Sequence, residues 1–212
     1  MKKIILCGLA AVMMLATVSV SAQGNAWNRK KYLNIGYVMQ NIDGGDSQLK
    51  SDMGLSLSWG KQYYLHSKPL AKMIKFGLDW SWVDLNYASF SSEALNYDDE
   101  PVSIGLKQIE YAMQVGPSIT INPYHDIKIS AYFRVSPSFS LQLSKGDGTD
   151  IGYNYVTFMN AGASFAWRIL SVGVEYRWGN TKYKSIDFGN LAITQSDKLK
   201  VGTTRIYFGL RF

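Results

Sequence analysis

Apolar and polar residues alternate along eight stretches of the chain, which is the period of a β-strand with one apolar and one polar face. The clearest stretch covers residues 127–141, where Ile129 and Phe133 lie on the apolar face and Lys128 and Arg134 lie on the polar face. The other stretches begin at about residues 33, 53, 74, 109, 153, 172 and 204. No helical period, internal repeat or domain linker interrupts them. The chain is therefore predicted to be an all-β protein with one domain.

The connections between these stretches alternate in length. Residues 66–70, 122–126 and 168–170 are short turns, whereas the segments 41–52, 88–106, 144–152 and 180–202 are longer, polar and rich in Gly, Asp and Ser. An up-and-down barrel has this arrangement when one rim carries tight turns and the other carries loops. We therefore predict an antiparallel barrel, closed on itself, of eight strands.

Alternation alone does not decide whether the apolar face points into a soluble, lipocalin-like barrel or outward into lipid. Three features favour lipid. The stretches are long enough to cross ~25 Å of hydrocarbon, and the polar face mixes Gly and Ser with charges of both signs, as a narrow lumen requires. The third feature is a set of aromatic residues near the ends of the apolar face, which matches the aromatic girdles of transmembrane barrels: Trp59, Trp80, Trp82, Tyr153, Tyr155, Trp167, Tyr176 and Trp178.

The first residues have the parts of a secretory signal peptide: a basic start, an apolar run, and small residues up to Ala22. We predict cleavage between Ala22 and Gln23, so that residues 1–22 are the signal and residues 23–212 are the barrel domain. The apolar run is short for a membrane anchor, and Cys7 lies very early for a lipoprotein; both remain alternatives. Because Cys7 leaves with the signal, the mature chain is predicted to have no disulfide and no thiol chemistry.

The formal net charge of the whole chain is +6, and its basic residues are scattered. This distribution argues against nucleic acid as a partner. No stretch after the signal approaches 18 apolar residues, which argues against a helical membrane protein.

Most charged residues of the strands lie on the polar face. If the apolar face contacts lipid, this polar face lines the lumen. The predicted lumen network comprises Lys75, Asp79, Glu110, Gln114, Lys128, Tyr132, Arg134, Glu175, Arg177 and Arg205, with Arg211 at its edge. Eight strands enclose an interior that side chains just fill. One interpretation is a salt-bridged plug, in which Glu110 pairs with Arg134, or Arg134 pairs instead with Asp79 or Glu175. The other is a conduit that prefers anions, because the cations outnumber the acids.

Catalytic and metal-binding residues are poorly represented. The two histidines, His66 and His125, fall in short turns, where we expect them to be solvated and away from any Ser nucleophile at the opposite rim. Neither a metal-ligand cluster nor a cofactor motif is found. The four long segments hold most of the acids, in loose calcium-loop patterns such as 43–46, 98–100 and 146–150. These acids are either a solvated surface or a site where divalent cations bridge to lipopolysaccharide.

The last residues carry a resemblance. Ile206, Phe208, Leu210 and Phe212 alternate with polar residues up to the aromatic end. The chain in this respect resembles bacterial outer-membrane β-barrel proteins, whose final strand ends in this way. The resemblance implies that these four residues are the signal read by the barrel-assembly machinery. It also implies that the partners are outer-membrane lipid and lipopolysaccharide.

The strand number and the absence of cysteine resemble the small OmpA/OmpX-type barrels, and the Ser-Ala-Gln junction after the signal resembles those of Bacteroidetes proteins. The Bacteroidetes barrels that the chain resembles include a PorT-like subfamily linked to secretion. We therefore expect a porin-like, signal-peptide-exported barrel in a Gram-negative outer membrane. It is expected to be non-catalytic, without cofactor, and to contact envelope or host proteins through its loops. The alternatives are a narrow channel or secretion component, and a lipid-active enzyme.

Overall fold

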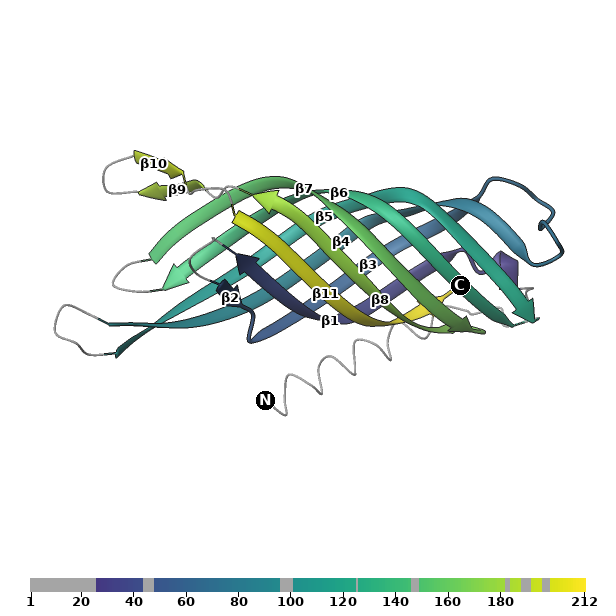
Figure 1. Cartoon of the computed structure of the whole chain (residues 1–212), viewed down its shortest axis with the longest axis horizontal. Coiled ribbons are helices and arrows are strands. Elements are labelled where there is room, and N and C mark those ends of the chain that lie inside the picture. Colours follow the sequence, from purple (N-terminus) through teal and green to yellow (C-terminus); the bar gives the residue numbers. More distant parts are fainter. Residues whose placement is uncertain are drawn as a thin grey trace.

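Antiparallel strands close into a tilted barrel (Figure 1). The computed structural model describes residues 26–43, 48–95, 101–124, 126–145, 149–181, 184–187, 192–195 and 199–212. Within these residues the barrel strands are β1 (Lys31–Asp43), β3 (Met53–Tyr64), β4 (Ile74–Leu95), β5 (Pro101–Tyr124), β6 (Ile127–Lys145), β7 (Thr149–Trp167), β8 (Leu170–Thr181) and β11 (Leu199–Arg211). Three short strands, β2 (Gln48–Lys50), β9 (Lys184–Asp187) and β10 (Ala192–Gln195), and one 3₁₀ turn, η1 (Ala26–Asn28), complete this part of the chain. No helix in it is long and apolar enough to cross a membrane.

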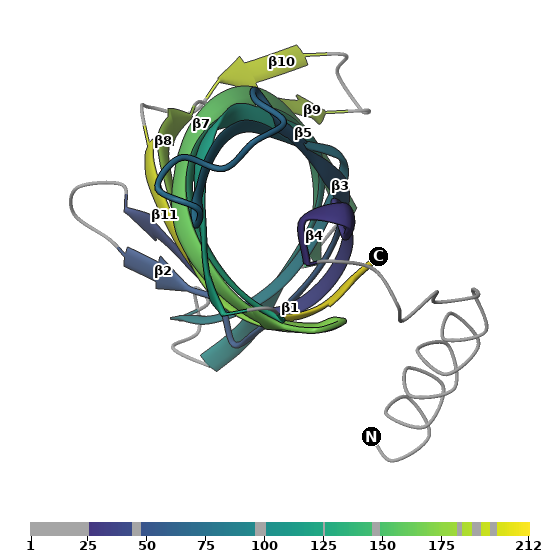
Figure 2. The same cartoon turned by 90° about the vertical axis from the view of Figure 1, so that its right-hand side faces the viewer.

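The barrel is closed by the first and last long strands. β1 pairs with β11, with Ile35 opposite Phe208, and β11 pairs in turn with β8, with Arg205 opposite Glu175. Viewed from one end, the strands form a ring (Figure 2). The predicted fold, an all-β, up-and-down antiparallel barrel of eight strands, is confirmed.

The apolar face of each barrel strand points outward. In β1 Ile35, Tyr37 and Met39 are exposed, whereas Asn34 and Gln40 are buried in the interior. The other barrel strands repeat this pattern of exposed apolar and buried polar residues. An exterior of this kind is stable only against lipid, and closure leaves no strand edge unpaired in the hydrocarbon.

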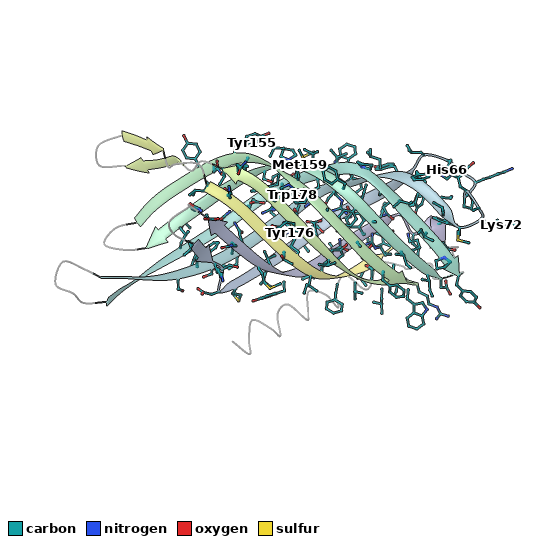
Figure 3. The ribbon with its side chains drawn as sticks, viewed as in Figure 1. His66, Lys72, Tyr155, Met159, Tyr176 and Trp178 are labelled. Atoms are coloured by element: carbon teal, nitrogen blue, oxygen red, sulfur yellow. The ribbon has the colours of Figure 1, made fainter. Side chains whose placement is uncertain are left out.

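Aromatic residues form a belt near each end of the exterior. Toward the long-loop end, Tyr176 stacks on Trp178 with 5.7 Å between the ring centroids, and Tyr155 is exposed farther along β7 in the same direction (Figure 3). Toward the short-turn end, Trp80 and Trp167 lie on the outer face near the strand ends. Two belts separated by aliphatic residues mark the two interfaces of a bilayer.

Glycines on the inner wall make room for tyrosines that reach across the lumen. Tyr132 lies directly opposite Gly162, and Tyr207 lies directly opposite Gly173. A Cβ atom at Gly162 would come within 2.5 Å of the Tyr132 ring, so only glycine fits there. The hydroxyl groups of Tyr132 and Tyr207 meet at 3.0 Å. Glycines on the polar face thus leave the space that the large side chains in the lumen occupy.

A bulge changes the phase of β4. The register against β5 shifts between Ser81 and Asp84, and both residues are fully buried. Simple alternation from Ser81 would place Val83 inside and Asp84 outside. The bulge reverses this and adds a carboxylate to the lumen that the sequence did not predict.

The longer segments contain more strand than expected. Residues 88–106 were predicted to be a loop, but β4 and β5 stay paired from Ala88 opposite Gln108 to Leu95 opposite Pro101. Within 41–52, β2 folds back on β1, and within 180–202, β9 pairs with both β7 and β10. The loop prediction was wrong here because it relied on alternation of apolar and polar residues. A strand that projects beyond the membrane does not require an apolar face and so lacks this signal.

The opposite rim carries the turns, the end of β11 and η1 (Figures 1 and 2). The connection from β3 to β4 spans residues 65–73, longer than the predicted 66–70. It reverses through Ala71 (φ 48°) and Lys72 (φ 63°), both in the left-handed region, and Leu70 bridges back to Ile74. The turns at this rim are therefore more varied in length than the sequence suggested.

Candidate functional site in the barrel lumen

All ten residues of the predicted lumen network are buried inside the barrel. They come from five of the long strands, and each is less than a tenth exposed: Lys75, Asp79, Glu110, Gln114, Lys128, Tyr132, Arg134, Glu175, Arg177 and Arg205. Strand alternation alone brings them together, because every second side chain of a closed sheet points to one axis. Arg211, expected at the edge, is also buried.

Arg134 lies at the centre of the network. Its guanidinium lies 3.1 Å from Asp79 and 3.3 Å from Glu175, and it donates a hydrogen bond of 2.6 Å to the side-chain oxygen of Gln114. The same group stacks on the ring of Tyr132, 3.6 Å from its centroid. Arg134 therefore joins residues of four strands.

Arg205 makes the second group of ion pairs. One of its terminal nitrogens lies 2.9 Å from both carboxylate oxygens of Asp84 and 3.2 Å from Glu175. The amide of Gln114 donates to Asp84 and to Glu175. Gln114 thus connects the Arg205 group with the Arg134 group, as a bridging residue.

Arg177 and Glu110 form the third group. Both terminal nitrogens of Arg177 donate to the two carboxylate oxygens of Glu110, one of them at 3.1 Å, and the guanidinium lies 4.3 Å from the ring centroid of Phe158. The first pairing suggested from the sequence, Glu110 with Arg134, is therefore wrong. Alternation shows which residues face the lumen, but the partner of each depends on strand register and barrel shear.

An apolar layer lies beyond the ion pairs, toward the long-loop end. It consists of the buried residues Ile42, Ala88, Phe90, Val156, Phe158 and Val201, with Leu49, Leu106 and Leu199 packed against them. Most of these residues fall in segments that the sequence predicts to be loops. Val156 and Phe158 did carry a signal, because they are apolar residues at polar positions of their strand.

Aromatic rings and cations occupy the short-turn end of the lumen. Trp27 of η1 packs edge-on against Tyr64 at 5.4 Å between centroids, and the ammonium of Lys75 lies 4.8 Å from the Trp27 ring centroid. Lys128 donates a 2.7 Å hydrogen bond to the backbone oxygen of Arg29. The segment before β1 is thereby fixed inside this end of the barrel.

His66 lies in an exposed turn, as expected, and it also has a structural role there. One ring nitrogen lies 2.6 Å from the backbone oxygen of Lys68, and the other accepts a 3.1 Å hydrogen bond from the backbone of Phe76. Both nitrogens are used to hold the turn between β3 and β4. His125 lies outside the described residues.

The described residues contain no group of three or more His, Cys, Asp or Glu side chains that could hold a metal ion. The candidate calcium segments fall largely outside these residues, as do Cys7, Ala22 and Gln23. Ile206 and Phe208 are exposed on the outer face of β11, with Leu210 and Phe212 partly exposed. Their role as an assembly signal stays a prediction.

This chain resembles known proteins in structure but not in sequence. No protein family and no curated protein matches the sequence. Among solved structures, the attachment invasion locus protein Ail of Yersinia pestis superposes with a TM-score of 0.51 at 14% identity, over 86% of this chain and 98% of that chain. Neisserial surface protein A has a TM-score of 0.48 at 10% identity, over 86% of this chain and 97% of that chain. The protease OmpT of Escherichia coli has a TM-score of 0.46 at 11% identity, also over 86% and 97%.

The chain has the fold of the small outer-membrane β-barrels. At this identity the likeness establishes the fold alone, and it rests on Ail. The apolar exterior with two aromatic belts agrees with it. The protein is thus an outer-membrane β-barrel, as expected from the sequence.

Proposed function

We propose that this protein is a closed, non-catalytic barrel that holds its long-loop rim outside the membrane for contact with lipopolysaccharide, envelope proteins or host proteins. The observation that carries the proposal is the filled lumen. Arg134, Arg177 and Arg205 cross its middle with their carboxylate partners, and an apolar layer lies above them. A hydrated path would have to pass through both layers.

The decisive experiment is a conductance measurement on the purified mature protein in planar lipid bilayers. We expect no discrete conductance steps at moderate voltage. A matched sample of a known porin checks that the bilayers report insertion. Reproducible steps would contradict the closed-barrel proposal and favour a channel.

A narrow anion conduit is the alternative with an observation in its favour. Among the described residues seven buried side chains are cations and four are acids. This excess predicts that any conductance is anion-selective. Reversal potentials in a salt gradient distinguish this alternative from an unselective leak. A secretion component of the PorT-like kind instead predicts loss of exported cargo when the gene is deleted.

The segments of the long-loop rim are rich in acidic residues, unlike a surface that binds polyanions. The structure of Ail was determined with the heparin analogue sucrose octasulfate. Here the four long segments hold eleven of the sixteen acids: Asp43, Asp46, Asp52, Glu93, Asp98, Asp99, Glu100, Asp147, Asp150, Asp187 and Asp197. An acidic rim repels sulfated sugars and favours lipopolysaccharide bridged by divalent cations. Cells that display the protein should bind lipopolysaccharide in a manner that chelation of calcium and magnesium abolishes.

A lipid-active enzyme is not favoured by the described residues. His66 lies at the short-turn rim and its two ring nitrogens are engaged. A nucleophile at the outer rim would lack this base. An unchanged mass spectrum of lipid A after gene deletion is the expected result.

A further inference from the structure

The buried charges are distributed unevenly along the lumen. In the middle, four carboxylates face three guanidinium groups: Asp79, Asp84, Glu110 and Glu175 against Arg134, Arg177 and Arg205. The other buried cations all lie at the short-turn end: Arg29, Lys75, Lys128 and Arg211. The middle is therefore slightly acidic, and its acids are already engaged. The acids of the middle form no ion pair with Lys75, Lys128 or Arg211 among the described residues.

Three ammonium groups gather round Tyr64 at this end. The nitrogen of Lys75 lies 5.1 Å from the ring centroid of Tyr64, and that of Lys30 lies 5.8 Å from it. The nitrogen of Lys128 lies 3.5 Å from the Tyr64 hydroxyl. Aromatic faces attract cations but do not neutralise them. The rings therefore supply no counter-charge to this cluster.

Arg211 extends the cluster along the wall beside Lys128. Its guanidinium donates to the hydroxyl oxygens of Ser171 at 3.2 Å and Ser164 at 3.3 Å. Ser164 lies two residues from Ala166, which is directly opposite Lys128. The wall here thus offers guanidinium, ammonium and hydroxyl donors from β6, β7, β8 and β11.

Acidic side chains are scarce at this end. Asp126 lies 3.7 Å from Arg29 and 3.4 Å from Arg168, and its side chain is 37% exposed. The remaining residues of the short-turn segments, including residues 23–25 and His125, contain no acidic side chain. No acidic side chain of these segments is therefore left for Lys75 or Lys128. Burying such cations without a counter-charge is costly.

We propose that the short-turn end of the lumen binds a phosphate group. A phosphate offers more acceptor oxygens than a carboxylate, so it can receive hydrogen bonds from donors on several strands at once. Lys75, Lys128 and Arg211 are the binding residues, with Trp27 and Tyr64 forming the apolar side of the site. The basic rim attracts anions toward it: Lys31, Lys61, Lys68, Lys72 and Arg168. This site does not depend on the lumen being closed.

The phosphate has two sources, which share this chemistry. One is a free phosphate or phosphorylated solute of the compartment that the short turns face. The other is the headgroup of a phospholipid in the adjoining leaflet, whose phosphate lies at the height of the rim.

The test titrates purified barrel in micelles of a phosphate-free, non-ionic detergent with inorganic phosphate, by calorimetry at constant ionic strength. We expect saturable binding, weakened about tenfold or more in the double variant Lys75→Met with Lys128→Met, because charge-assisted hydrogen bonds are lost. The matched control is Lys107→Met, an exposed residue near the opposite rim, which should bind as the unaltered protein does. A heat-modifiable gel band shows that each variant is folded.

A second arm uses vesicles of phosphatidylglycerol and of phosphatidylcholine, with retained lipid counted by native mass spectrometry. Retention of phospholipid that falls in the double variant and persists in Lys107→Met identifies a headgroup as the ligand, whether or not free phosphate binds. Binding of free phosphate alone identifies a solute. If neither probe binds, or if the double variant binds both as well as Lys107→Met does, the proposal is wrong.

Discussion

At the scale of single residues, the ion pairs of the lumen are expected to be coupled in defined partnerships. Glu110→Gln or Arg177→Met alone strands one buried charge, which should lower the free energy of unfolding by about 3–5 kcal/mol. The double variant should lose far less than the sum, because neither charge is left behind. Urea unfolding in vesicles measures each loss. The control cycle, Glu110→Gln with Arg134→Met, joins groups that are not paired and should be nearly additive; strong coupling there would contradict the observed partnerships.

Gly162 is expected to be intolerant of a side chain because the Tyr132 ring lies on it. Gly162→Ala should destabilise the barrel by about 1–3 kcal/mol, the usual cost of overpacking. Gly202→Ala is the matched control, since its Cβ would meet only the hydroxyl end of Tyr176 at 3.1 Å. Equal urea midpoints for the two variants would argue against a tyrosine-filled lumen.

The sequence predicted which residues face the lumen but not how they pair. Alternation suffices for Lys128 and Arg134 because β6 is regular. It fails for Asp84, since a bulge leaves little trace in composition, and for the Glu110–Arg177 pair, since register is a property of the closed sheet. Loop-like polar composition also concealed the apolar layer that includes Phe90.

At the scale of elements, two neighbouring residues of β11 point to opposite faces of the barrel wall. Phe208 is 72% exposed on the lipid side, whereas Tyr207 is 5% exposed in the lumen. Phe208→Arg should cost about 2–4 kcal/mol near mid-depth. Tyr207→Arg should cost less, because the new cation lies in a polar lumen rather than in hydrocarbon. Urea midpoints in vesicles give the order, and a severe Tyr207→Arg with a silent Phe208→Arg would mean that the apolar face points inward.

At the scale of the whole molecule, closure predicts resistance to detergent. With β1 paired to β11, no strand edge is open to unzip, so the folded barrel should persist in cold dodecyl sulfate and unfold on boiling. The measurement is the electrophoretic mobility of the mature protein before and after heating. Identical mobility, with recovery of the protein in the soluble periplasmic fraction, would contradict a lipid-facing barrel.

The whole molecule also raises the question whether one layer of the lumen or two layers block the passage of ions. The ion pairs of Arg177 and the apolar layer around Phe90 and Phe158 lie in succession along the axis, so either is expected to block ions alone. Phe90→Ala with Phe158→Ala should therefore remain non-conducting, as should Glu110→Ala with Arg177→Ala. The quadruple variant should give conductance steps in planar bilayers if these two layers are the main barrier, because the ion pairs of Arg134 and Arg205 that it keeps are polar and can be hydrated once the neighbouring layers are gone. All three variants must first show the heat-modifiable band, since each Phe→Ala change costs about 3–5 kcal/mol. Conductance steps in either double variant would mean that the remaining layer does not block ions alone. A quadruple variant without steps would place the block at the ion pairs of Arg134 and Arg205 or at the Trp27 end of the lumen.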